Sequence, residues 1–409
     1  MLPIMAMIGV MAVAGAALAV DLARAYAFRH QLQLAADAAA LAAAVNLPDK
    51  AAARKAAYRY AERNMPGFDQ VIADDGIEFG RWNPDTRRLE GDGQAPSAVK
   101  ITSKLSVANG NPLNTLFAGF LGSEELDVAA SAVAGKRSPM CILSLEPELA
   151  DGLGMDIAAK IEALNCTVQV NSRHRWAFRN LLGSRFLASG LCVTGGAYVS
   201  MFGRVTPEPT LGCPPQVDPL VGLQPPEFTG CDYNDTRLSG HHGTLQPGVY
   251  CGGLEITGAS NVELAAGVYV IKDGPLAIGD VTEVRGDAIT FYLTGSEALI
   301  DFQDDSQLSL TAPTDGDLAG ILVFQDREFG GDHVWDSAAP TTLHGTIYLS
   351  EGRLVSQSSN AITPVNSCNV LIAKSLHFKY QSAVSIDLGQ KRCRQFLPAA
   401  LLGTVALLD

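Results

Sequence analysis

Residues 245–274 read LQPGVYCGGLEITGASNVELAAGVYVIKDG, and this stretch contains one pattern twice. In each copy a short apolar run containing Gly-Val-Tyr is followed by glycine or another turn residue. Similar runs recur further along the chain, and one core position aligns across Tyr250, Tyr269, Tyr292, Phe324, Tyr348 and Ile372. The intervals are 19, 23, 32, 24 and 24 residues, and the longest one contains an insert over 327–340. Repetition at this spacing predicts a structure of stacked units.

A period of roughly 20 to 25 residues with two or three short strands is typical of a parallel β-helix. Gly, Asn, Asp and Ser would supply the backbone angles of its corners, and apolar side chains would stack inside. We therefore predict a disulfide-bonded β-helix over residues 137–409, with a β-sandwich as the alternative. The apolar tail that begins at Phe396 is expected to cap the open end of the β-helix.

The N-terminal residues 1–22 are predicted to form a membrane anchor. No charged residue interrupts Leu2–Val20, and this stretch is long enough to cross a hydrocarbon core. A cleaved signal peptide is the competing interpretation, although no basic segment precedes the apolar stretch. Arg24 and Arg29 follow it, and taken alone they would place this flank in the cytoplasm. The cysteines of the chain argue for export instead.

A helix is predicted over residues 21–64, because this part is rich in Ala, Leu, Gln and Arg. Short alternating segments follow over 76–135, including GIEFGRW and AVKITSKLSV, and they are separated by Pro, Gly and Asp. Such alternation is typical of strands. The chain is therefore expected to be mainly β, with one long helix near its N-terminus.

Asp21, Tyr26 and the run LQLAADAAALAAA at Leu32–Ala44 follow the apolar segment. Together they resemble the N-terminal signature of TadE/TadG-like proteins of the Tad, or Flp-type, pilus apparatus. The resemblance implies a pilin-like α+β module over residues 23–136, followed by an exported domain. The C-terminal half is similar to Tad-type proteins through CILSLEPE at Cys141 and CTVQVNS at Cys166. The basic leader usual in the family is absent here, and so is the Asp-x-Ser-x-Ser metal site of some relatives.

The eight cysteines begin at Cys141 and form no CxxC pair, which favours disulfides and an oxidising compartment. Eight cysteines allow 105 connectivities, and the sequence does not choose among them. Spacing suggests two pairs that are each 25 residues apart, about one coil. These are Cys141 with Cys166 and Cys368 with Cys393. Closure of the Pro-rich segment would then join Cys213 with Cys231 and leave Cys192 with Cys251.

The formal charge of −13 with only 30 Lys and Arg argues against a nucleic-acid partner. The sequence contains no GxSxG, GxxxxGK[ST] or HExxH motif. The nearest carboxylate cluster is Asp301, Asp304 and Asp305, and neighbours on a strand face opposite sides, which favours solvated turn acids. We therefore expect no catalytic residue, no metal and no cofactor, and a protein that is not an enzyme.

One basic-aromatic patch interrupts the acidic sequence, at Arg173, Arg175, Trp176 and Arg179. Such a patch is suited to acidic surface glycans, lipid headgroups or a partner subunit; solvated arginines at a coil corner are the alternative.

The resemblance implies a structural or assembly component of a Tad pilus, minor-pilin-like or adhesive, with other pilus-apparatus subunits as partners. The expected location is the inner membrane, with a single span and most of the chain periplasmic or exposed at the cell surface. The alternative is a membrane-anchored β-helix protein that binds or cleaves extracytoplasmic polysaccharide.

Overall fold

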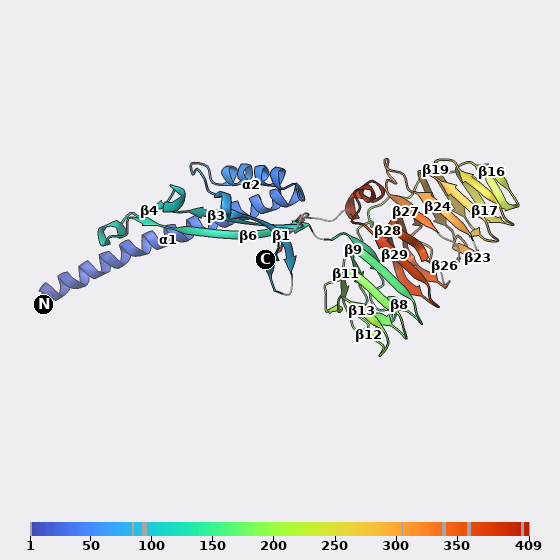
Figure 1. Ribbon diagram of the computed structural model, residues 1–409, viewed down its shortest axis with the longest axis horizontal. Helices are drawn as coiled ribbons and strands as arrows, with labels where there is room; N and C mark the ends of the chain where they lie inside the picture. Colours follow the sequence, from blue (N-terminus) through green and yellow to red (C-terminus); the bar gives the residue numbers. More distant parts are fainter. Residues whose placement is uncertain are drawn as a thin grey trace. The chain divides into compact units, whose positions relative to one another are not determined.

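The structure is a computed structural model that describes residues 2–83, 86–91, 96–136, 138–304, 306–337, 341–357, 361–401 and 405–408 (Figure 1). The chain forms two compact units, Met1–Arg137 with Gly403–Asp409, and Ser138–Leu402. The second unit is therefore an insertion near the end of the first. Each unit has its own hydrophobic core.

The first unit begins with two helices, α1 (Leu2–Val45) and α2 (Lys50–Asn64). The prediction of one continuous helix over 21–64 is thus wrong, because the helix is interrupted between Val45 and Lys50. Pro48 cannot donate a backbone hydrogen bond, and Asp49 begins a new helix by accepting bonds from the N–H groups of Ala51 and Ala52 at 2.9 and 3.0 Å.

A five-stranded antiparallel sheet completes the first unit. Its order is β2 (Arg88–Glu90), β1 (Ile77–Asn83), β3 (Ala98–Leu105), β6 (Val128–Lys136) and β30 (Val405–Leu407). A small hairpin of β4 (Leu113–Asn114) and β5 (Glu125–Leu126) lies beside it. Alanines of α1 are buried against β3 and β6, and alanines of α2 are buried against α1, because their short side chains let the elements approach closely.

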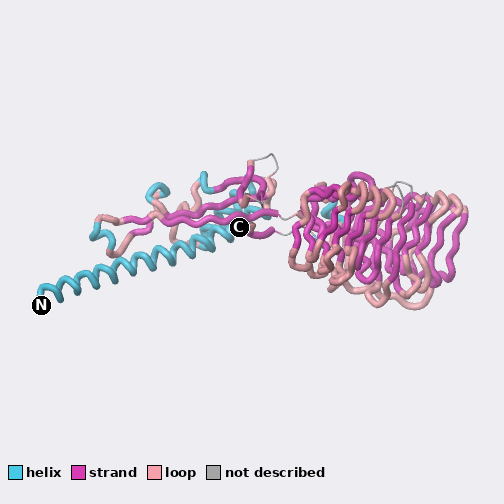
Figure 2. Tube along the Cα trace, turned by 90° about the horizontal axis from the view of Figure 1, so that it is seen from below, coloured by secondary structure: helices cyan, strands magenta, loops and turns pink. Residues whose placement is uncertain are grey.

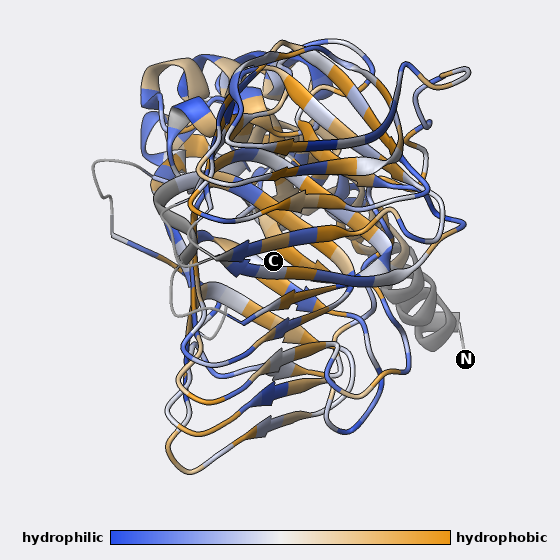
Figure 3. Ribbon diagram, turned by 90° about the vertical axis from the view of Figure 1, so that its right-hand side faces the viewer, coloured by the Kyte–Doolittle hydropathy of each residue, from blue (hydrophilic) through white to orange (hydrophobic). Residues whose placement is uncertain are grey.

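The second unit is a parallel β-solenoid of about ten turns, which confirms the predicted β-helix (Figure 2). Its strands form three parallel stacks, and each coil passes through them in the order sheet 1, sheet 2, sheet 3. Sheet 1 includes β19 (Gly267–Lys272) and β22 (Ile289–Thr294), sheet 2 includes β20 (Leu276–Ile278) and β23 (Ile300–Asp304), and sheet 3 includes β21 (Glu283–Gly286) and β24 (Gln307–Thr311). Apolar side chains of successive coils stack inside as one continuous cluster. In Figure 3, hydrophobic strands follow one another along this stack.

The solenoid has two arms, which we define by their strands. The short arm comprises residues 138–211. Its strands are β7 (Met140–Ser144), β8 (Leu153–Met155), β9 (Lys160–Val170), β10 (Phe178–Asn180), β11 (Arg185–Val193), β12 (Ala197–Val199), β13 (Arg204–Thr206) and β14 (Thr210–Leu211).

The long arm comprises residues 232–388. Its strands are β15 (Tyr233–Ser239), β16 (His242–Leu245), β17 (Gly248–Thr257), β18 (Asn261–Leu264), β19 (Gly267–Lys272), β20 (Leu276–Ile278), β21 (Glu283–Gly286), β22 (Ile289–Thr294), β23 (Ile300–Asp304), β24 (Gln307–Thr311), β25 (Ile321–Gln325), β26 (Gly331–Ser337), β27 (Thr342–Ser356), β28 (Ala361–Phe378) and β29 (Ala383–Asp387).

The coils are not stacked in chain order. The chain enters at β7, winds outward through the short arm, crosses to the far end of the long arm and winds back to the middle. There β28 pairs with β7 and β8, and β29 pairs with β9. The solenoid is therefore circularly permuted, with entry and exit on neighbouring coils.

The aromatic position aligned in the sequence separates into two rows. Tyr269 is in register with Phe291, whereas Tyr292, one residue further on, is in register with Val270. Because neighbours on a strand face opposite sides, these rows lie on opposite faces of sheet 1. Tyr250, Tyr269 and Phe291 stack inside, with ring centroids 5.9 and 5.7 Å apart. The outward row contains Tyr292, Phe324 and Tyr348, with centroids 5.2 and 5.5 Å apart.

The predicted cap at the C-terminal tail is wrong. Residues 391–401 form two 3-10 turns that pack on β27 and β28, with the Phe396 ring 5.1 Å from that of His344. These coils lie within the stack, away from either end. Val405–Leu407 then joins the sheet of the first unit as β30. The tail is thus divided between the two units.

Candidate functional site

A strap, residues 212–231, carries the chain from the short arm to the far end of the long arm. It crosses the outward face of sheet 1 and covers the outward aromatic row. Tyr348 donates a hydrogen bond to Asp218 of the strap at 2.6 Å, and Phe228 lies 6.1 Å from Tyr292 between ring centroids. Tyr292 and Tyr348 are consequently buried.

Arg327 makes the main polar contacts that hold the strap in place. Its guanidinium donates to the carbonyl oxygens of Leu223 and Leu220 at 2.9 and 2.7 Å. The same group lies over the rings of Phe324 and Tyr348, 5.2 and 5.4 Å from their centroids. A planar cation that bonds carbonyls and stacks on rings suits Arg and not Lys. Burial, followed by the bond to Asp218, raises the pKa of Tyr348 to about 12.

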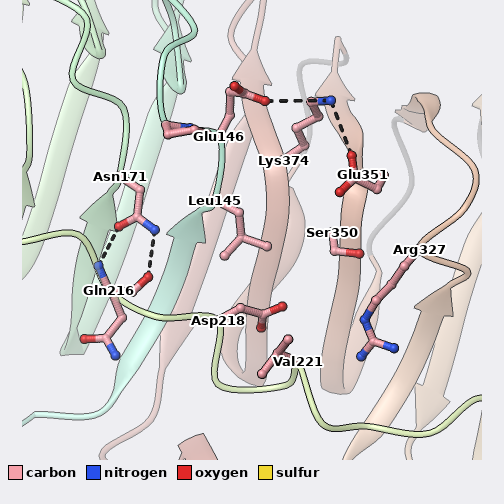
Figure 4. A pocket seen from close by; sticks show the side chains of 11 residues that line it. Leu145, Glu146, Asn171, Gln216, Asp218, Val221, Arg327, Ser350, Glu351 and Lys374 are labelled. Atoms are coloured by element: carbon pink, nitrogen blue, oxygen red, sulfur yellow. Dashed lines mark hydrogen bonds and ion pairs between the residues drawn. The ribbon is translucent and has the colours of Figure 1, made fainter.

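A pocket of about 360 Å³ lies between the strap and the coils at the junction of the two arms (Figure 4). Lys374 lies between Glu146 and Glu351, at 3.7 and 3.4 Å. On the other side, Asn171 and Gln216 exchange two hydrogen bonds of 2.8 Å. The charged groups of the pocket are paired with one another, with Tyr348 or with strap carbonyls. These contacts hold the strap against the coils.

A second cavity, of about 750 Å³, lies further along the strap. Strap residues 222–227 line one side, and the loop 313–318 lines the other. Within the described part of the chain, no group of three His, Cys, Asp or Glu side chains is placed to hold a metal ion. Of the acidic cluster considered above, Asp305 and the side chain of Asp304 lie outside the described residues.

Three residues of the predicted basic-aromatic patch, Arg173, Arg175 and Trp176, lie on the loop between β9 and β10, and Arg179 lies in β10 itself. Arg173 pairs with Glu148 at 3.0 Å, and Arg179 pairs with Asp151 at 2.8 Å. Arg175 lies over the Trp176 ring, 4.2 Å from its centroid. Two of the three arginines are therefore neutralised. Only the Arg175–Trp176 stack keeps the predicted character.

The eight cysteines form four disulfides, and two of the predicted pairs are confirmed: Cys141–Cys166 and Cys368–Cys393. The other two are wrong, because the structure joins Cys192 to Cys213 and Cys231 to Cys251. Cys192 lies in the short arm and Cys251 at the far end of the long arm, so they cannot meet. Each end of the strap is instead linked to the coil beside it.

In the first unit, Asp21 of α1 is a buried carboxylate that fixes a loop. It accepts hydrogen bonds from the backbone N–H groups of Leu116, Phe117 and Ala118 at 2.7, 2.8 and 2.7 Å. Its oxygens thereby satisfy three donors that would otherwise be buried without partners. The loop between β4 and β5 is consequently held against the helix.

Part of the surface of α1 is exposed and apolar. Leu18, Leu22, Tyr26 and Leu34 are 53%, 72%, 75% and 51% exposed. With the exposed His30, they recur every four residues, so each lies beside the next in a row that winds around the helix by about 40° per step. We call these five residues the α1 stripe. Periodicity alone missed it, because the buried face of α1 is made of alanines and is no more apolar than the exposed face.

The predicted anchor, Leu2–Val20, falls mostly on residues 2–14, whose side chains lie outside the described residues. In the part that is described, no helix combines the length and the apolarity that a membrane crossing requires.

The strap contacts of Arg327 and Tyr348 could not be predicted from the sequence. The Pro-rich composition and the flanking cysteines were the only signal that this segment is special. Nothing in the sequence indicates which coils it crosses, because that depends on the permuted order of the stack.

Comparison with known families identifies the first unit. Residues 1–46 match a family described as putative Flp pilus-assembly TadE/G-like, and residues 34–134 match one described as putative Tad-like Flp pilus-assembly. No curated protein and no solved structure gives a significant match. Both matches end before the solenoid begins. These matches and the four disulfides together indicate an exported, pilus-associated protein. The N-terminal third of the chain, residues 1–134, is thus similar to Tad-type Flp pilus-assembly proteins.

Proposed function

We propose that the protein is a minor-pilin-like structural subunit of a Tad pilus apparatus, and that it acts by packing and binding without catalysis. In this proposal residues 1–22 hold it in the inner membrane, and the solenoid is a scaffold in the periplasm or at the cell surface. Other pilus-apparatus subunits are its partners. The observation that carries the proposal is the α1 stripe.

The stripe lies on a helix whose other face is already occupied. Leu32 and Ala35 are buried against the sheet, and Phe28 packs on Phe68, with ring centroids 5.5 Å apart. A row of exposed apolar side chains on a firmly held helix is typical of a surface that packs on another protein. The clamp at Asp21 supports this reading, since it makes the helix a rigid element to pack against.

The polysaccharide-cleaving alternative has less support. Glu146 and Glu351, the paired carboxylates that a hydrolase would need, are both engaged with Lys374. We therefore propose that the protein is not an enzyme. The Arg175–Trp176 stack is the part of the predicted patch that is suited to surface glycans. Incubation with a glycan panel tests both points: binding without release of reducing ends is expected, and turnover would refute the proposal.

The experiment for the stripe is a charge placed on it. Leu22→Glu combined with Tyr26→Glu should abolish recovery of the tagged chain in the pilus fraction and reduce the number of pili seen by electron microscopy. Tyr60→Glu on α2, where the side chain is 40% exposed, is the matched control and should leave both unchanged. Circular dichroism of the purified variants verifies folding. Normal pili with the double variant incorporated would refute the proposal.

A further inference from the structure

Four successive coils of the solenoid turn from sheet 2 to sheet 3 through corners of four residues. The corners are 379–382, 156–159, 181–184 and 200–203. Strand register aligns them, because Phe378, Met155, Asn180 and Val199 pair in turn before the corner. After the corner, Ala383, Lys160, Arg185 and Arg204 pair in turn. Residues at the same position of each corner therefore lie one above the other, about 4.8 Å apart.

The second position of every one of these corners is a large exposed apolar side chain. Tyr380, Ile157, Leu182 and Met201 are 65%, 54%, 51% and 90% exposed, and Phe202 beside Met201 is 66% exposed. We call these five residues the apolar ladder. It runs from the middle of the solenoid to the free end of the short arm. A contiguous row of this kind on a soluble surface marks a contact with something apolar.

A second ladder runs three residues further along each coil. Lys160, Arg185 and Arg204 are exposed and in register on β9, β11 and β13. Like charges on neighbouring strands destabilise a sheet. Lys160 has Glu162 as a partner at 2.7 Å, whereas the guanidinium groups of Arg185 and Arg204 make no hydrogen bond or ion pair with any described residue.

The acidic groups close to these ladders are already paired. Asp156, at the first position of its corner, lies 3.7 Å from Arg179 and 3.2 Å from His377. Glu162 is bound to Lys160. The surface that combines the two ladders therefore carries unpaired positive charge next to exposed apolar groups.

We infer that this edge of the short arm binds an anionic phospholipid surface. Ile, Leu and Met are suited to the acyl boundary of a bilayer, and the adjacent arginines to its anionic headgroups. Glycans favour aromatic platforms, and the ladder is mainly aliphatic. The net charge of the long arm, with 7 Lys and Arg against 20 Asp and Glu, would repel the same surface. Charge thus orients the solenoid with its short arm toward the lipid.

The test uses tryptophan as a depth probe in the full-length protein. Leu182→Trp is mixed with vesicles of phosphatidylcholine alone, or with phosphatidylglycerol, each containing brominated lipid, and the wild type gives the baseline of the native tryptophans. Val281→Trp is the matched control, because Val281 is 66% exposed at a corner of the long arm. Any insertion of residues 1–22 is common to all variants and cancels in this comparison.

The indole introduced by Leu182→Trp should be quenched in anionic vesicles at least twice as strongly as that of the control variant, and should not be quenched in phosphatidylcholine. Reversing the basic ladder with Arg185→Glu and Arg204→Glu should weaken this contact by more than about fivefold at each position, because each change removes a positive charge and adds a negative one. Arg237→Glu on the long arm should have no effect. Equal quenching at positions 182 and 281, or quenching that ignores lipid charge, would overturn the inference. A blue shift that depends only on protein concentration would also overturn it, and would assign the ladder to self-association.

Discussion

The two arms of the solenoid share one coil geometry but differ at the surface. The short arm has 6 Lys and Arg against 6 Asp and Glu, while the long arm has 7 against 20, a difference equal to the whole formal charge of −13. The strap covers aromatic rings of the long arm, whereas apolar side chains stay exposed at the corners of the short arm. The inward residues of both arms merge in one core. The stacking of the coils thus depends on the residues that face inward, whereas the residues that face outward can differ between the two arms.

The largest effect should come from releasing the strap at both ends. Replacing Cys192, Cys213, Cys231 and Cys251 by Ser removes two links, whose cysteines are 21 and 20 residues apart. Loops of this length stabilise by about 3 kcal/mol each, because they restrict the unfolded chain. Denaturant unfolding should therefore show a loss of about 6 kcal/mol. Removing either disulfide alone should lower the free energy of unfolding by the same amount, although the two disulfides belong to different arms. A disulfide whose removal leaves the free energy of unfolding unchanged would contradict this prediction.

Low pH should destabilise the long arm more than the short arm. Burial lowers the pKa of His333 to about 4, and its neutral Nδ1 accepts a hydrogen bond from the N–H of Ile300 at 3.1 Å. The unfolded imidazole takes up a proton near pH 6.5, so this stability is complete above pH 6.5 and is lost as pH falls toward 4. The loss should reach about 3 kcal/mol at pH 4. Burial also lowers the pKa of His344 in the same arm.

Hydrogen exchange with mass spectrometry at pH 7 and pH 5, corrected for the intrinsic rate, measures this difference. Amides of β23 and β26 should lose protection before those of β9 and β11. His333→Asn keeps an acceptor without a titrating ring and should reduce the acid sensitivity. Simultaneous loss of protection in both arms would show that they unfold as one.

A smaller effect is expected from the polar contacts of Arg327 with the strap. Arg327→Met keeps much of the side-chain length but removes the bonds to Leu220 and Leu223, and should cost about 2 kcal/mol. Arg353→Met breaks an exposed ion pair with Asp332 on the same arm and should cost less than about 1 kcal/mol. Limited proteolysis should cut the strap only in the first variant. Equal stability of the two variants would indicate that the aromatic contacts alone hold the strap.

The smallest effect is that of salt. Raising the ionic strength screens repulsion among the acidic groups of the long arm, which should gain a few tenths of a kcal/mol. The short arm, with balanced charge, should gain nothing. Exchange rates measured at two salt concentrations would show the difference, and an equal response would mean that net charge does not distinguish the arms.

Much of the fold could be predicted from spacing, because each coil must bury a similar set of apolar residues. The intervals between Tyr250, Tyr269 and Tyr292 reveal a repeat, but they do not show which side of the strand each residue faces. Tyr292 lies one residue beyond the position that pairs with Tyr269, so its ring points to the outside of the coil. The interval between the two tyrosines does not reveal this shift. The 25-residue disulfides follow from the same spacing.

The rest depends on the order of the coils. The repeat length is the same whether the next coil is added at one end of the stack or at the other. The periodicity of the sequence therefore does not reveal the permuted order of the coils. Pairing Cys192 with Cys251 failed for that reason. Corner residues such as Leu182 and Met201 carried no signal either, because an isolated apolar residue in a turn is common. The α1 stripe was hidden by an alanine-rich helix that is apolar on both faces.

Entry and exit at neighbouring coils have a consequence for biogenesis. The short arm emerges from synthesis or translocation first, yet the open edge of β7 and β8 stays without its partner until β28 arrives more than 200 residues later. Until then two incomplete stacks coexist, each with an uncovered strand edge that invites misassembly. Closure of this seam must therefore wait until β28 has been made. A chain truncated before Ala361 would lack the closing coil however well its individual turns had formed.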